Sequence, residues 1–160
     1  MDVFAIAAEF VQHGMDKTGI RLTHSLEAYL AITFSKYIHK KIDVDCLTTR
    51  VVNAMDAHAP KDVLRELADQ TLIACSFFED RLRRTGVVRT YVGLGQVTYE
   101  AAGLTEQAYG FVHMRDVVAF CSQDQDTRII LDLARSGSTV ARQQLGNVVI
   151  GPWAKQKWLS

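Results

Sequence analysis

The sequence predicts an all-α fold, a single-domain bundle of about six to eight helices spanning residues 1–160. Apolar residues recur at three- and four-residue steps over most of the chain, which is the periodicity of helices with one buried face. Only residues 148–150 have a strand-like composition, and three residues do not make a sheet. A chain of 160 residues can bury roughly 70% of its unfolded surface, so the fold requires neither a disulfide nor a metal.

Four helices are predicted in the first half of the chain. The first covers about residues 3–12, and the second is amphipathic and covers residues 22–37. The third runs from about Leu47 to Ala57, with Asp45 placed to cap it. Pro60 precedes the fourth, because proline is tolerated in a first helical turn. That helix starts at Lys61 and ends near Gly86.

The second half continues the same periodicity. A stripe from Val88 to Ala102 predicts a helix with Gly95 at its centre, where glycine costs about 1 kcal/mol relative to alanine. Close approach of another helix would explain that glycine. Further stripes cover residues 104–119 and 130–134, the latter ending at Gly137. A short helix is predicted over residues 138–144, followed by an irregular tail over residues 147–160.

The composition favours a cytoplasmic protein without a general affinity for nucleic acid or membranes. Eighteen basic residues balance eighteen acidic ones. The three cysteines are far apart and set in apolar segments, as expected for thiols in a reducing compartment. The N-terminal segment lacks the basic start of a signal peptide, and no apolar run approaches the roughly 20 residues of a membrane span.

No catalytic or metal-binding motif is present in the sequence. It contains no Glu-x-x-His, Cys-x-x-Cys, His-Glu-x-x-His or Gly-x-Ser-x-Gly. No histidine or basic cluster lies near a cysteine in sequence to activate it. We therefore expect no catalytic residue, no metal and no cofactor, and the sequence favours a protein without enzymatic activity over an enzyme.

Two groups of residues are candidates for contacts with a partner. The first is the arginine pair Arg83 and Arg84, the centre of a basic cluster. Glu79 and Asp80 lie four residues before them, the order that stabilises a helix by about 0.2–0.5 kcal/mol per pair. These pairs favour a structural role, so we do not expect a nucleic-acid partner. The second is Trp158 in the basic tail, because tryptophan is frequent in binding hot spots.

Arg115 is the centre of the alternative, a small-ligand site. It falls within the apolar stripe of residues 104–118, so a regular helix would turn it toward the core, where a guanidinium requires a partner. Asp69 and Glu66 on the long central helix are candidates by residue type. With Asp69 and His113, Arg115 could instead line a pocket for an anionic ligand.

The central segment also resembles a known group of proteins. The residues that carry the resemblance are Leu64-Arg65-Glu66-Leu67-x-Asp69, Phe77-Phe78, Arg83-Arg84, Tyr91, Gly95 and Tyr99. This pattern is similar to that of a family of uncharacterised bacterial helical proteins, in which glycines stand at the positions of Ala68 and Ser76. The resemblance covers about residues 22–145. It implies a helical fold in a bacterial cytoplasm and carries no activity.

A non-enzymatic protein-interaction or self-association module is the function that the sequence favours. Several apolar residues fall off the main stripes of their helices and either pack in a second layer or form an interface: Ile32, Leu72, Tyr109 and Phe120. We therefore expect a protein partner or a homo-oligomer, with a small anionic-ligand-binding sensor or enzyme as the alternative.

Overall fold

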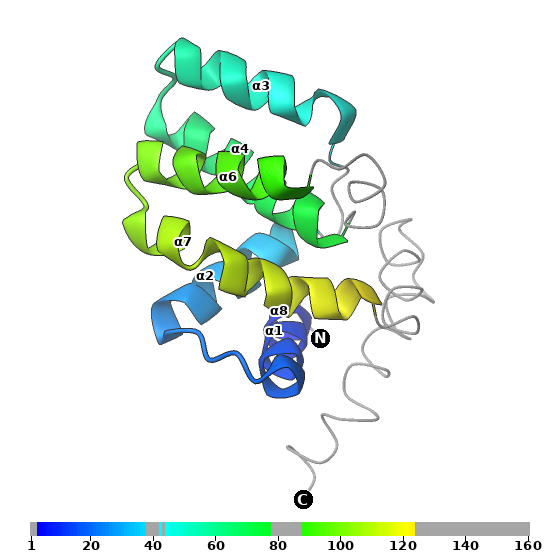
Figure 1. The fold of residues 1–160 in the computed structure, drawn as a ribbon. Coiled ribbons are helices and arrows are strands. Elements are labelled where there is room, and N and C mark those ends of the chain that lie inside the picture. Colours follow the sequence, from blue (N-terminus) through cyan, green and yellow to red (C-terminus); the bar gives the residue numbers. More distant parts are fainter. Residues whose placement is uncertain (1–2, 38–41, 43, 78–87, 124–160) are drawn as a thin grey trace, which may run out of the picture. The chain divides into compact units, whose positions relative to one another are not determined.

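The computed structural model describes residues 3–37, 42, 44–77 and 88–123 of the chain (Figure 1). Within these ranges the chain forms seven helices and no strand, which confirms the all-α bundle. The helices are α1 (Val3–Thr18), α2 (His24–Tyr37), α3 (Val44–Asp56), α4 (Lys61–Phe77), α6 (Val88–Ala101), α7 (Thr105–Tyr109) and α8 (Phe111–Gln123).

Three of the predicted boundaries are wrong. Helix α1 continues to Thr18 instead of ending at Gln12. Helix α3 begins at Val44, so Asp45 lies inside the helix and not at its N-cap. The stripe of residues 104–119 is two helices, because Gly110 departs from helical geometry with φ −87° and ψ 4°. The elements predicted beyond residue 123, and the helix end at Gly86, lie outside the described residues.

The helices fall into two compact units. The first contains residues 1–41 and 117–160, and therefore α1, α2 and most of α8. The second contains Ile42–Asp116, and therefore α3, α4, α6, α7 and the start of α8. A single domain over residues 1–160 stays a prediction, and each unit is described by itself below.

The first unit has an aromatic core. Helices α1 and α2 pack through Phe10 and Phe34, whose rings meet edge to face with centroids 5.7 Å apart. Helix α1 also comes close to α8, because a Cβ atom added at Gly14 would lie 2.6 Å from the carbonyl oxygen of Val117. His13, the residue before Gly14, is buried, and the centroid of its ring lies 5.5 Å from the centroid of the Phe120 ring. Phe120 therefore packs within this unit.

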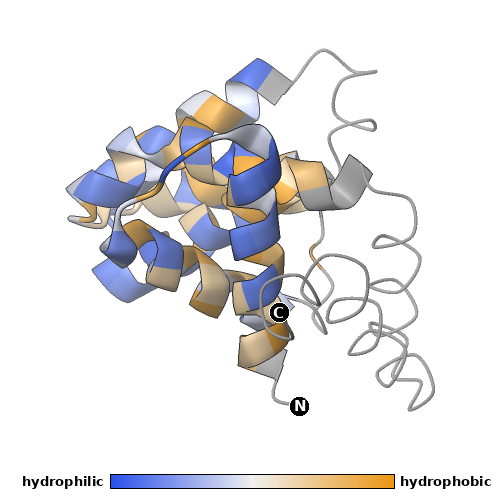
Figure 2. Cartoon of the chain, turned by 90° about the horizontal axis from the view of Figure 1, so that it is seen from below, coloured by the Kyte–Doolittle hydropathy of each residue, from blue (hydrophilic) through white to orange (hydrophobic). Residues whose placement is uncertain are grey.

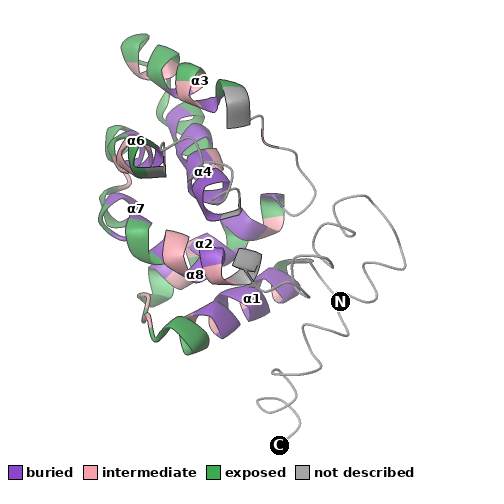
Figure 3. Cartoon of the chain, turned by 45° about the vertical axis from the view of Figure 1, so that its right-hand side comes forward, coloured by how far each residue is buried: buried purple, intermediate pink, exposed green. Residues whose placement is uncertain are grey.

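Helix α4 is the centre of the second unit. It packs against both α3 and α6. It is largely buried, whereas α3 is exposed along much of its length (Figure 3). Leu72, Ile73 and Ala74 are consecutive residues and all are fully buried. Since consecutive residues of a helix point in different directions, more than one face of α4 is apolar along this part of the helix. Hydrophilic and hydrophobic residues otherwise alternate around the helices, as an amphipathic pattern requires (Figure 2).

The predicted close approach at Gly95 is confirmed. A Cβ atom at this position would overlap the ring of Phe111, the first residue of α8. Phe111 is fully buried, so its ring has little room to move aside. Glycine at position 95 therefore allows the Phe111 ring to rest directly on the backbone of α6.

Gly95→Ala and Gly93→Ala are expected to change stability in opposite directions. Nothing lies within 4 Å of a Cβ atom at Gly93, so alanine there gains only helix propensity, about 0.5–1 kcal/mol. At Gly95 the same gain is outweighed by overpacking, which typically costs about 1–3 kcal/mol. Chemical denaturation of both variants measures the difference. Equal effects at the two positions would contradict the packing of Phe111 on Gly95.

Candidate functional site

A buried polar pair joins α4 to α6. The Tyr99 hydroxyl donates a hydrogen bond of 2.6 Å to Oδ1 of Asp69, and both side chains are buried. The Tyr99 ring also lies against Phe111, with centroids 6.0 Å apart. A carboxylate and a phenol in a protein interior require partners, because an unsatisfied polar group there costs free energy. The pair therefore fixes how α4 and α6 pack.

Arg115 hydrogen-bonds to Cys75 and Asp116, neither of which was among the partners that we expected for it by residue type. Its Nε donates to the backbone carbonyl of Cys75 at 3.4 Å, and its Nη1 donates to Asp116 at 2.8 Å. Glu66 is exposed, and Asp69 accepts its hydrogen bond from Tyr99. Only 15% of the Arg115 side chain is exposed and its Nη2 atom is buried, so the guanidinium lies largely within the unit with a carboxylate beside it. This placement agrees with a structural role.

The structure places the three candidate ligand-binding residues, Arg115, Asp69 and His113, in different surroundings. Arg115 reaches α4 at Cys75, which lies six residues, or about 9 Å along the helix, beyond Asp69. His113 is exposed, and two residues that are two positions apart on a helix do not face the same way. No group of three metal-ligating side chains occurs among the described residues.

The candidate interface residues Arg83, Arg84 and Trp158 lie outside the described residues. Exposed apolar side chains within the described second unit are therefore the basis of the site below.

A recess between α6 and α7 forms the first candidate surface, which we call the α6–α7 recess. Helix α6 ends in a Schellman motif: Gly103 has φ +80°, its N–H binds the Glu100 carbonyl, and the Leu104 N–H binds the Tyr99 carbonyl. This turn brings α7 back against α6, leaving a hollow of about 300 Å³. Its lining residues are Gln96, Val97, Glu100, Thr105, Ala108 and Tyr109.

The apolar rim of this recess is unusually exposed. Tyr109 is 82% exposed and Val97 is 52% exposed, while Ala108, which also lines the recess, is buried. The sequence placed Tyr109 on the far side of its helix, and the structure confirms this. A large aromatic side chain that packs against almost nothing in its own unit is available for contact with another protein.

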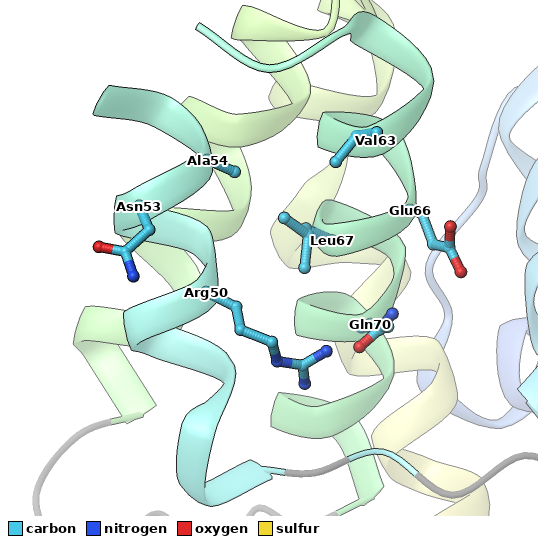
Figure 4. Close-up of a pocket in the computed structure, with 7 residues that line it drawn as sticks. All are labelled: Arg50, Asn53, Ala54, Val63, Glu66, Leu67 and Gln70. Carbon is cyan, nitrogen blue, oxygen red and sulfur yellow. The ribbon is translucent and has the colours of Figure 1, made fainter. Parts of the chain in front are cut away.

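A groove between α3 and α4 forms the second candidate surface, which we call the α3–α4 groove (Figure 4). The two helices are joined by a short turn in which His58 adopts φ +50° and the Ala59 N–H binds the Ala54 carbonyl. The groove measures about 430 Å³. Its lining residues are Arg50, Asn53, Ala54, Val63, Glu66, Leu67 and Gln70.

Our sequence interpretation missed the α3–α4 groove. Its two halves come from separate helices, and no motif links them. One signal was present: Arg50 lies three residues after the buried Leu47 and four before Ala54, so a cation shares a helix face with apolar residues.

Each helix within the described ranges is too short or too polar to cross a membrane. No protein-family model, no curated protein and no solved structure matches the chain. The resemblance to uncharacterised bacterial helical proteins therefore carries no family assignment.

Proposed function

We propose that this chain is a non-enzymatic helical module that acts through protein contact, and that the α6–α7 recess is its contact surface. The observation that supports the proposal most strongly is the exposure of Tyr109 beside Val97 at the rim of a preformed hollow. Interface cores are enriched in aromatic residues, and tyrosine is among the residues that dominate binding energy.

The partner is a second copy of the chain or another protein. The chain has no net charge, because its 18 basic and 18 acidic residues cancel. Net charge far from zero keeps proteins monomeric through repulsion, and that barrier to self-association is absent here. Glu100 and Thr105 also line the recess and give its apolar rim a polar margin. Protein interfaces commonly have an apolar centre that is surrounded by polar residues.

Tyr109→Ala is expected to dissociate the complex while the helices stay folded. Loss of an interface hot spot costs about 2 kcal/mol or more, which weakens binding about thirtyfold. The measurement is size-exclusion chromatography of extracts of the natural host containing the tagged chain. The wild-type protein should elute well above the position of its 17.9 kDa monomer, and the variant should elute at that position.

Val52→Ala is the matched control, because Val52 is 42% exposed on α3, away from the recess. This variant should elute with the wild-type complex. Elution of the wild-type chain as a monomer, or an unchanged complex in Tyr109→Ala, would overturn the proposal.

A further inference from the structure

We propose that the α6–α7 recess binds a basic side chain, a lysine or an arginine, of another protein. The charged head of that side chain lies between the Glu100 carboxylate and the Tyr109 ring, which both line the recess. Its apolar stem lies over Val97 and Ala108. This inference rests on the function proposed above, because it names the chemistry of the partner at the same surface.

The recess has a negative charge. Among the six described residues that line it, Glu100 alone is charged. Between Arg89 and Arg115 the sequence contains only two residues with charged side chains, counting histidine as neutral, and both are acidic: Glu100 and Glu106. Arg89 lies eleven residues before Glu100 on α6, about 16 Å away along the helix. The charge of this surface therefore favours a cation over an anion.

The Glu100 carboxylate is open to a partner. Its side chain is exposed, and within the described part of the chain no hydrogen bond or ion pair holds the carboxylate. Lys61 lies beside the turn after α6, with its Nζ 3.4 Å from the position of a Cβ atom on Gly103, and does not line the recess. Glu100 also lies in the last turn of α6, where the helix dipole disfavours an acidic group. The cost of an acid at this position agrees with a role in binding.

Tyr109 and the apolar lining complete a site for a basic side chain. The face of an aromatic ring attracts a cation within about 6 Å of the ring centre, and the Tyr109 ring is largely exposed. Lysine and arginine also have apolar stems, which cover apolar surface while the charged head stays near water. The hollow of about 300 Å³ lies at the lower end of the range for small-molecule sites, roughly 300–1,000 Å³, so it suits a single side chain.

A symmetric contact between two copies of the recess is unfavourable. In a dimer with two-fold symmetry the same surface lies on both subunits, so Glu100 of one copy would approach Glu100 of the other. Like charges that meet across an interface disfavour association, and no cation among the described lining residues offsets them. The recess therefore matches a basic segment of another protein better than it matches itself.

Competition between purified chains tests this inference. The tagged wild-type chain, bound in its complex in an extract of the natural host, is titrated with untagged chain, and size-exclusion chromatography follows its release. Glu100→Gln keeps the shape of the side chain and removes the charge, so at least about tenfold more of this variant should be needed for release. Glu66→Gln makes the same change at an exposed residue of α4 outside the recess and should compete within about threefold of the wild-type chain.

Two further measurements separate recognition of the charge from damage to the fold. Glu100→Gln should be at least as stable to denaturant as the wild-type chain, because it removes a negative charge from the C-terminal turn of α6. Added salt should weaken the wild-type complex more than the complex of Glu100→Gln, because salt screens the attraction that the variant has lost.

The possible results distinguish a failure of this inference from a failure of the proposed function. Equal competition by Glu100→Gln and the wild-type chain would overturn the inference, and poor competition by Tyr109→Ala would then leave the contact surface in place. A second copy of the chain as the sole partner in native mass spectrometry would overturn the inference as well. Equal competition by Tyr109→Ala and the wild-type chain, or the absence of any complex, would overturn both.

Discussion

Phe111→Ala is expected to lower the free energy of unfolding by about 3–5 kcal/mol, the largest effect of any substitution considered for this chain. Phe111 is fully buried where α8 begins, its ring rests on Gly95, and it also contacts the ring of Tyr99. Truncation removes the ring from all of these contacts and leaves a cavity that the surrounding helices fill only in part.

Denaturant unfolding of Phe111→Ala measures this loss, and Val112→Ala is its control. Val112 is the next residue of α8 and is exposed, so its truncation should cost within about 0.5 kcal/mol. The Gly95→Ala penalty should also disappear in the Phe111→Ala background, because the atoms that it would overlap are gone. A loss below 1 kcal/mol for Phe111→Ala would contradict the packing described here.

Tyr99→Phe is expected to lower the free energy of unfolding by about 1–3 kcal/mol. The substitution keeps the ring against Phe111 and removes only the hydroxyl that donates to Asp69. The buried Asp69 carboxylate then has one donor fewer, and a buried charged acceptor that loses a donor is costly.

Tyr109→Phe removes the same hydroxyl from an exposed tyrosine and is the control for Tyr99→Phe. Its effect on thermal or denaturant unfolding should be within about 0.5 kcal/mol. Equal stability of the two variants would show that the Asp69–Tyr99 hydrogen bond does not stabilise the packing of α4 on α6.

Helix content and most helix positions were predictable because they depend on local periodicity. The helix starting after Pro60 and the helix over Val88–Ala101 appear as expected, and Gly95 has the close neighbour that its position indicated. The break at Gly110 was not predictable in this way. The hydrogen bonds at Gly110 continue in helical fashion on both sides, so the apolar stripe passes through it with no change of period.

The contacts of the candidate site depend on which helices are neighbours, and periodicity does not specify neighbours. Arg115 was expected to turn toward the core, and its side chain is only 15% exposed and reaches the Cys75 carbonyl on α4. Its partner Asp116 is adjacent in sequence, whereas we looked for one on another helix. The groove beside Arg50 arises only when α3 folds back along α4. Helix geometry placed Tyr109 off the apolar stripe of its helix, but only the structure decides that it is exposed and not packed in a second layer.

Native mass spectrometry of the chain, purified gently from its natural host, tests the proposed contact function most directly. We predict a mass that corresponds to an integer oligomer or to the chain with a bound protein, and loss of that species in Tyr109→Ala. A wild-type chain found only at its monomer mass of 17.9 kDa, with or without a small ligand, would contradict the account.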